Sequence, residues 1–239
     1  MSRGGTGTRP LKGGKALSQE VKPLHELLPA YYSLLVSGPP GVGKFEWMID
    51  LARRYLEKGE RIIFVTLDMH PREVRERGAA SGLDIAKYEA SGFLFVDCYS
   101  ASTNERGEEP SGKKVYAVSS FSNLEGLGMA IAKAAQDLKP PVRIFVYSAS
   151  TLFLHNSPQA IAKFIQIVTN RVKTGMGFVA YALQDGVHDE LTTNLLRSLV
   201  DGVVEMRFTD GMDREVRAHH LRGIAVTSTW RRFPAGGTA

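Results

Sequence analysis

Cysteine is almost absent from this chain of 239 residues, which contains Cys98 alone. A single cysteine excludes an intramolecular disulfide framework, and it leaves no cluster of cysteine and histidine for a zinc site. Long apolar runs are absent too, because no segment is uninterrupted enough to cross a membrane and no apolar signal-peptide core follows Met1. We therefore expect a cytoplasmic protein that makes no contact with a membrane.

A strong excess of charge of either sign is also lacking. The chain has 30 Lys and Arg against 25 Asp and Glu, a formal net charge of +5, and this balance permits a nucleic-acid partner without requiring one. Hydrophobic residues make up 43% of the chain, which suits one globular domain with a full core. We expect a flexible basic tail over residues 1–22, a folded domain over residues 23–234 and a short disordered tail over residues 235–239.

The most informative stretch is a short apolar run followed by a glycine-rich turn and a helical pattern. Gly38, Gly43 and Lys44 match G-x-x-x-x-G-K, the first seven positions of the phosphate-binding P-loop. Such a turn directs backbone N–H groups at an anion, and its lysine reaches the outer phosphates. The candidate nucleotide-binding residues are Gly38, Pro39, Pro40, Gly41, Val42, Gly43, Lys44 and Phe45.

The eighth position of the motif is occupied by Phe45, where a Ser or Thr hydroxyl would hold magnesium. The bare pattern is weak, and an ordinary tight turn between strand and helix is the alternative reading. Its context favours a P-loop, because residues 32–36 form an apolar strand pattern and apolar residues recur at helical spacing up to Gly59. The sequence thus predicts a loop that holds ATP or ADP without a protein hydroxyl for magnesium.

The rest of the chain alternates between strand and helix patterns. Apolar runs at residues 61–67, 93–96, 142–147 and 177–183 predict buried strands, and residues 100–114 predict an exposed loop. Asn123 and Ser157 are expected to begin amphipathic helices. Residues 202–208 and 215–221 predict an antiparallel pair around Asp210-Gly211. The expected fold class is α/β, a mostly parallel sheet flanked by helices with antiparallel strands at the C-terminal edge.

Over residues 24–233, the chain resembles the RecA-superfamily ATPases, and within them the KaiC-like and archaeal RadA-paralogue branch. The resemblance rests on the order and spacing of several pieces: the P-loop, residues 64–68 with the following Pro-Arg-Glu-Val-Arg, residues 148–153, Gln184, residues 200–204 and Leu221-Arg222-Gly223. It implies a RecA-like core that binds ATP between adjacent subunits of a ring or filament. The partners it implies are the nucleotide and a second copy of the chain or a related RecA-family subunit.

The resemblance also implies roles for three further residues. Asp68, which ends a strand expected beside the P-loop strand, would orient the attacking water, and a purely structural role is the alternative. Gln184 would sense the γ-phosphate, or it would simply cap a loop. Arg222 would reach a neighbouring subunit's nucleotide, and the alternative is an ordinary surface arginine.

Several departures from the family pattern point to a degenerate ATPase. Phe45 replaces the magnesium-binding hydroxyl, and Tyr147 stands where the family has an Asp that orders the metal. Met69 replaces one of two acids, and His220 replaces the lysine that precedes Arg222 by two positions. Since phosphoryl transfer depends on positioning and charge neutralisation, these changes predict little hydrolysis.

Three functions follow as hypotheses. The first is an ATP-binding protein with a regulatory or assembly role, no protein-held metal and little hydrolysis. The second is a slow but genuine ATPase that recruits magnesium through Asp68, Asp97 or water. The third is a recombinase-like accessory protein that binds single-stranded DNA. It is the least favoured, because residues 185–190 carry three acids and no Lys or Arg.

Overall fold

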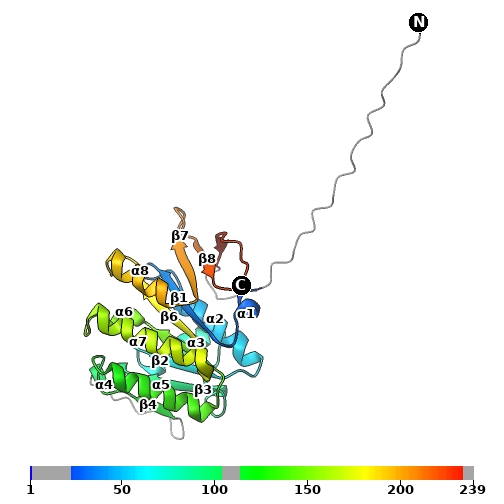
Figure 1. Ribbon diagram of the computed structural model, residues 1–239. Helices are drawn as coiled ribbons and strands as arrows, with labels where there is room; N and C mark the ends of the chain where they lie inside the picture. The colour runs from blue at the N-terminus through cyan, green and yellow to red at the C-terminus, as the bar shows by residue number, and fades with distance from the viewer. Residues whose placement is uncertain (2–22, 104–113, 234–239) are drawn as a thin grey trace.

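The computed structural model describes residue 1, residues 23–103 and residues 114–233. Within these residues, nine strands form one sheet in the order β4-β3-β2-β5-β6-β1-β7-β8-β9, with helices on both faces (Figure 1). The strands are β1 (Tyr32–Gly38), β2 (Ile62–Thr66), β3 (Phe93–Asp97), β4 (Val115–Ala117), β5 (Val142–Tyr147), β6 (Gly177–Gln184), β7 (Gly202–Phe208), β8 (Arg214–Leu221) and β9 (Arg231–Arg232). The helices are α1 (Leu24–Leu27), α2 (Lys44–Glu57), α3 (Pro71–Ala80), α4 (Tyr99–Thr103), α5 (Leu124–Leu138), α6 (Ala149–Leu152), α7 (Pro158–Arg171) and α8 (Glu190–Leu199), with single turns η1 (Ile85–Lys87) and η2 (Val172–Met176).

The strands β1 to β7 run parallel to one another, whereas β8 is antiparallel to β7 and β9 is antiparallel to β8. This arrangement confirms the predicted fold class, including the antiparallel strands at the C-terminal edge. Parallel strands end at the same edge of a sheet, which we call the carboxyl edge. The segments that follow β1, β2, β5 and β6 therefore gather at one place.

Each face of the sheet carries its own hydrophobic core. In β1, Leu34 and Val36 pack with residues of α2 and α3, whereas Leu35 packs with residues of α5, α7 and α8. This division follows from the alternation of side chains along a strand that is covered on both sides. All seven residues of β1 are buried, so the glycine-rich turn begins from a firmly packed strand.

The helix starts agree with the sequence reading. The side chain of Asn123 accepts a hydrogen bond from the backbone N–H of Gly126, and the side chain of Ser157 accepts one from Ala160. Each bond satisfies a backbone donor that the first turn of a helix leaves free. The two predicted caps are confirmed.

The predicted loop over residues 100–114 is wrong at its beginning, where α4 occupies Tyr99–Thr103. The carboxylate of Asp97 accepts the backbone N–H groups of Tyr99 at 2.9 Å and Ser100 at 3.0 Å, which begins a helix. The sequence reading also missed β4, a short and half-exposed strand paired with β3. Residues 104–113 of this loop, and the predicted tails apart from Met1, lie outside the described residues.

Candidate functional site

The glycine-rich turn connects the carboxyl end of β1 to the first residue of α2, which is Lys44. The ammonium of Lys44 donates hydrogen bonds to the carbonyl oxygens of Gly38 at 2.6 Å and Pro39 at 2.8 Å. Its side chain is buried, with 4% of the residue exposed. The turn thus folds around its own lysine.

Two glycines of the motif occupy positions that a side chain would not fit. A Cβ at Gly38 would lie 2.8 Å from the carbonyl oxygen of Met206 in β7. Gly43 has a φ of 101°, and a Cβ there would meet the guanidinium of Arg214 at 3.1 Å and the ring of Phe233 at 3.2 Å. Gly38 therefore allows close packing of the strands, and Gly43 allows the left-handed turn into α2.

Arg214 and Phe233 are site residues that the sequence reading missed. Arg214 begins β8 and Phe233 follows β9, and the backbone N–H of Phe233 donates to the Arg214 carbonyl at 2.7 Å. Both lie next to Gly43 although they are more than 150 residues away along the chain, so no local sequence pattern predicts them. Arg214 places a guanidinium beside the end of the P-loop.

The charge of Lys44 is set by burial and by two carboxylates. Burial lowers the pKa of Lys44 to about 8, although the negative charges of Asp185 and Asp68 act to raise it. Asp185 follows β6 directly, and its backbone N–H donates to the Gly38 carbonyl at 3.0 Å. Its position after a strand at the carboxyl edge is the signal by which the sequence could have identified it.

Phe45 occupies the metal-binding position of the motif, and its side chain is turned into the core. Its ring meets the ring of Tyr147 edge-on, with centroids 5.3 Å apart, and the ring of Phe64 at 6.1 Å. The two positions expected to serve the metal are thus filled by aromatic rings in contact with each other. Arg77 of α3 lies over the Phe45 ring, with its guanidinium carbon 4.2 Å from the ring centroid.

These residues do not fit a magnesium site. Magnesium takes oxygen ligands, usually carboxylates, phosphates and water. A phenyl ring offers none, and burial, with the nearby charge of Asp68, raises the pKa of the Tyr147 phenol to about 12, so that it stays protonated. Among the described residues, no group of three or more His, Cys, Asp and Glu side chains is placed to hold a metal ion.

The carboxylate of Asp68 is influenced by the charges of two cations, Lys44 and Arg77. Burial raises its pKa, while hydrogen bonds from Thr151 and from the backbone of Ser148, and the charges of Lys44 and Arg77, oppose that rise. The expectation that its strand neighbours the P-loop strand is wrong, because β5 and β6 separate β2 from β1. Asp68 nevertheless comes close to Lys44, because it lies beyond the end of β2 and bonds to the segment that follows β5.

Gln184 ends β6 directly opposite Gly38 in the strand register. Its backbone N–H donates to the Ser150 hydroxyl at 2.8 Å, and that hydroxyl also lies 2.9 Å from Nε2 of His188. Gln184, Ser148 and His188 help to line a hollow of about 240 Å³ at the carboxyl edge. The structure thus brings Gln184, Asp68 and Lys44 to the same edge of the sheet.

Arg222 lies elsewhere. It follows β8, which runs in the opposite direction to β1, so Arg222 is at the edge of the sheet opposite the P-loop. Its guanidinium donates to Asp201 at 3.2 Å, and its side chain is 63% exposed. The structure does not bring Arg222 to the P-loop of its own chain.

Residues 32–206 match the family described as "Family of unknown function (DUF7504)". UPF0273 proteins of Pyrococcus furiosus and Pyrococcus horikoshii are each 32% identical to this chain, over 155 residues (64% of this chain) and 171 residues (71%) respectively. A UPF0273 protein of Saccharolobus solfataricus is 32% identical over 154 residues, 64% of this chain. The matches cover 60%, 66% and 52% of those three relatives, so the chain spans about half to two thirds of their length.

One solved structure has a closely similar fold. The crystal structure of a KaiC-like protein from Pyrococcus horikoshii superposes with a TM-score of 0.70 at 17% identity, covering 89% of this chain and 91% of that one. At this identity the likeness shows the fold alone, a KaiC-like RecA fold. None of the described helices is long and apolar enough to span a membrane. Since the family match includes β1, the P-loop and every strand up to β6, the chain belongs to the family of unknown function DUF7504.

Proposed function

We propose that this protein binds ATP or ADP at residues 38–45, that its own cations rather than a protein-held metal neutralise the phosphates, and that it hydrolyses ATP very slowly. The observation that carries the proposal is the pairing of an intact P-loop lysine with a metal position filled by aromatic rings. Lys44 is held inside the turn by two carbonyls, whereas Phe45 and Tyr147 pack against each other.

The cations that would serve the phosphates come from three elements. Lys44 lies at the start of α2, Arg214 lies beside Gly43, and Arg77 lies over the Phe45 ring. Arg77 is also 3.3 Å from Glu46 and 3.7 Å from Glu73, and both contacts are partly exposed. Exposed ion pairs contribute little to stability, so breaking these two contacts would cost little. Arg77 can therefore turn towards a phosphate.

The regulatory or assembly role follows from the chemistry that the site lacks. In this proposal Asp68 would orient a water under the influence of the charges of Lys44 and Arg77, but no protein oxygen at positions 45 and 147 fits the metal that would balance the transferring phosphoryl group. A bound nucleotide then acts mainly as a ligand that stabilises one conformation or assembly. The position of Asp68 favours a second candidate, a slow but genuine ATPase that recruits metal through bound water.

Phosphate release from ATP tests this proposal. We expect turnover far below about 1 per second, the lower end of ordinary enzymes, since neither usual protein link to magnesium is present. The measurement uses purified protein with saturating ATP and magnesium, together with a binding titration that shows the site is filled. Turnover of several per second would refute the degenerate site, and an absence of nucleotide binding would refute the proposal as a whole.

A link between nucleotide and assembly is the finer part of the proposal. Arg222 is far from its own P-loop but exposed, so it can serve a P-loop only in a second subunit. We propose a ring or dimer, of this chain or with a related subunit, in which Arg222 contacts the neighbour's nucleotide. A guanidinium suits this task because its planar fork matches phosphate oxygens.

We expect ATP to tighten self-association of the unaltered protein, and Arg222→Ala to remove about tenfold or more of that tightening. The protomer should stay folded, because Asp201 keeps its bonds to Lys173 and Ser33 in the variant. Sedimentation with and without ATP measures the effect, with Arg72→Ala, a change at an 81% exposed side chain of α3, as the matched control. A monomer at every ATP concentration would remove the assembly role.

A further inference from the structure

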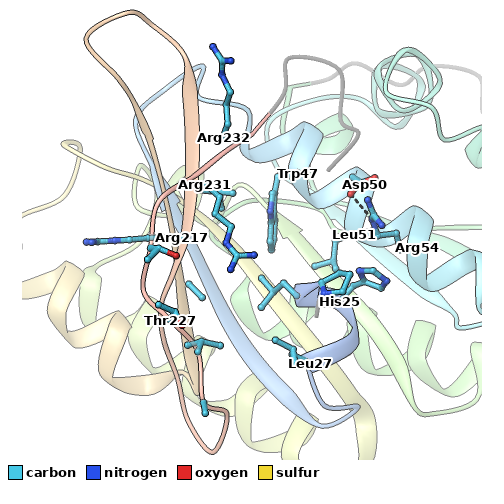
Figure 2. A pocket seen from close by; sticks show the side chains of 17 residues that line it. His25, Leu27, Trp47, Asp50, Leu51, Arg54, Arg217, Thr227, Arg231 and Arg232 are labelled. Atoms are coloured by element: carbon cyan, nitrogen blue, oxygen red, sulfur yellow. Dashed lines mark hydrogen bonds and ion pairs between the residues drawn. The ribbon is translucent and has the colours of Figure 1, made fainter. Parts of the chain in front are cut away.

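A second hollow, larger than the one beside Gln184, lies along α2. It measures about 530 Å³ and is bounded by α1, α2, β8 and residues 225–232 (Figure 2). We call it the α2 groove. Its volume falls within the range of about 300–1,000 Å³ that is usual for small-molecule sites.

Apolar side chains make up most of the floor of the α2 groove. Leu24 and Leu27 contribute from α1, Trp47 and Leu51 from α2, and Val226 from the segment before β9. The indole of Trp47 stands along the groove, where it presents a flat wall (Figure 2). A flat apolar surface of this kind suits the face of a ring or a short hydrocarbon.

Most of the arginines around the groove already have carboxylate partners. Arg54 donates to Asp50 at 2.8 Å, and Arg232 donates to Asp213 at 2.5 Å. Arg217 donates to Glu205 at 2.7 Å and extends away from the groove in Figure 2. The charges of these three arginines are therefore committed to the protein itself.

Arg231 is different. Across the residues that the structure describes, no hydrogen bond or ion pair joins its guanidinium to another side chain. Strand β9 pairs Arg231 with Val216, a groove residue, and alternation sends the neighbouring Arg232 to the opposite side. Figure 2 shows Arg231 extending into the groove alongside Trp47, while Arg232 points away.

Among the described residues that line it, the groove therefore has an apolar floor and one arginine, Arg231, without a carboxylate partner. Arg231 is exposed, so its guanidinium can reach a ligand in the groove, and a carboxylate, sulfonate or phosphate can accept two parallel bonds from it. Burial lowers the pKa of His25, which also lines the groove; the charges of Lys58 and Arg54 lower it further, while those of Glu26 and Asp50 oppose them.

We propose that the α2 groove binds a small molecule in which a flat apolar body carries an anionic group, with Trp47 packing on the body and Arg231 pairing with the anion. The chain's own residues 2–22 fit this description poorly. They carry five basic residues, Arg3, Arg9, Lys12, Lys15 and Lys22, against the single acid Glu20. Their charge has the same sign as that of Arg231.

The test compares two fluorescent probes with the same aromatic body. Anilinonaphthalene sulfonate carries an anionic group, and N-phenyl-naphthylamine lacks it. The chain has two tryptophans, so full-length protein with Trp230→Phe, excited at a wavelength that tyrosine does not absorb, leaves Trp47 as the sole energy donor to a bound probe. We expect energy transfer from Trp47 to the sulfonate probe, with its affinity lowered about tenfold by Arg231→Gln and that of the neutral probe unchanged.

Arg232→Gln is the matched control, since it removes the adjacent arginine on the opposite side of the same strand, and it should leave both affinities unchanged. Equal sulfonate affinity in Arg231→Gln and its parent would overturn the proposal. Displacement of the probe by ADP would place it at the P-loop, and displacement by a peptide of residues 2–22 would assign the groove to the chain itself. Either displacement would overturn the proposal as well.

Discussion

Replacing Lys44 by alanine is expected to lower the affinity for ATP and ADP by about a hundredfold or more, in magnesium and in EDTA alike. Lys44 is the only cation that the turn itself encloses. Its ammonium donates hydrogen bonds to the carbonyl oxygens of Gly38 and Pro39. Equilibrium titration with a fluorescent nucleotide measures the loss. Lys58→Ala, a change just beyond the C-terminal end of the same helix, serves as the control.

The variant should remain folded. The pKa of Lys44 falls from 10.5 to about 8 on burial, so the folded state disfavours its charged form. Below pH 8 the lysine is charged in both the folded and the unfolded state, so burying its charge lowers the stability of the folded protein. Alanine carries no charge and does not incur this cost. A melting temperature equal to or above that of the unaltered protein would separate lost binding from lost folding, whereas unchanged nucleotide affinity would contradict the role of Lys44.

The same pKa gives the pH dependence of binding. In the proposed function the nucleotide phosphates bind the charged form of Lys44, which loses its proton as the pH rises through about 8. The affinity of the unaltered protein should therefore fall between pH 7 and pH 9, by at most about tenfold for each pH unit above 8. Lys44→Ala should show no such fall.

The double change Phe45→Thr with Tyr147→Asp is expected to create magnesium dependence. It would supply a hydroxyl and a carboxylate at the two positions where the rings now meet, and these are ligands that magnesium accepts. We expect nucleotide affinity to become about tenfold or more tighter in magnesium than in EDTA, and magnesium-dependent phosphate release to rise.

This variant removes buried aromatic contacts, so its stability needs a matched comparison. Loss of a buried phenyl ring costs about 3–5 kcal/mol, and Phe45 is 1% exposed. Phe45→Ala with Tyr147→Ala creates similar cavities but offers no oxygen ligands, and it should show no gain in magnesium dependence. A folded Thr–Asp variant that behaves like the Ala–Ala variant would show that the rings are not what excludes the metal.

The sequence predicts the P-loop and most of the sheet because their signals are local. Gly38, Gly43 and Lys44 lie within seven positions, and the apolar runs of β1, β2 and β3 are buried strands as expected. Strand β4 was missed, because its three residues are half-exposed and carry too short an apolar pattern.

The parts of the site that sequence reasoning missed depend on distant contacts. Arg77 meets Phe45 from another helix, and Arg214 and Phe233 reach Gly43 only because β8 and β9 return along the sheet. Asp68 approaches Lys44 although two strands separate β2 from β1. Which side chains meet across such distances is decided by packing and strand order, and the linear sequence does not display either.

The measurement that tests the central claim most directly is the nucleotide affinity of the unaltered protein in magnesium and in EDTA. With Phe45 and Tyr147 closing the metal position and Lys44, Arg77 and Arg214 available to the phosphates, the two dissociation constants should agree within about tenfold. A loss of affinity of about a hundredfold or more in EDTA would show that a metal holds the nucleotide here, and it would contradict the account.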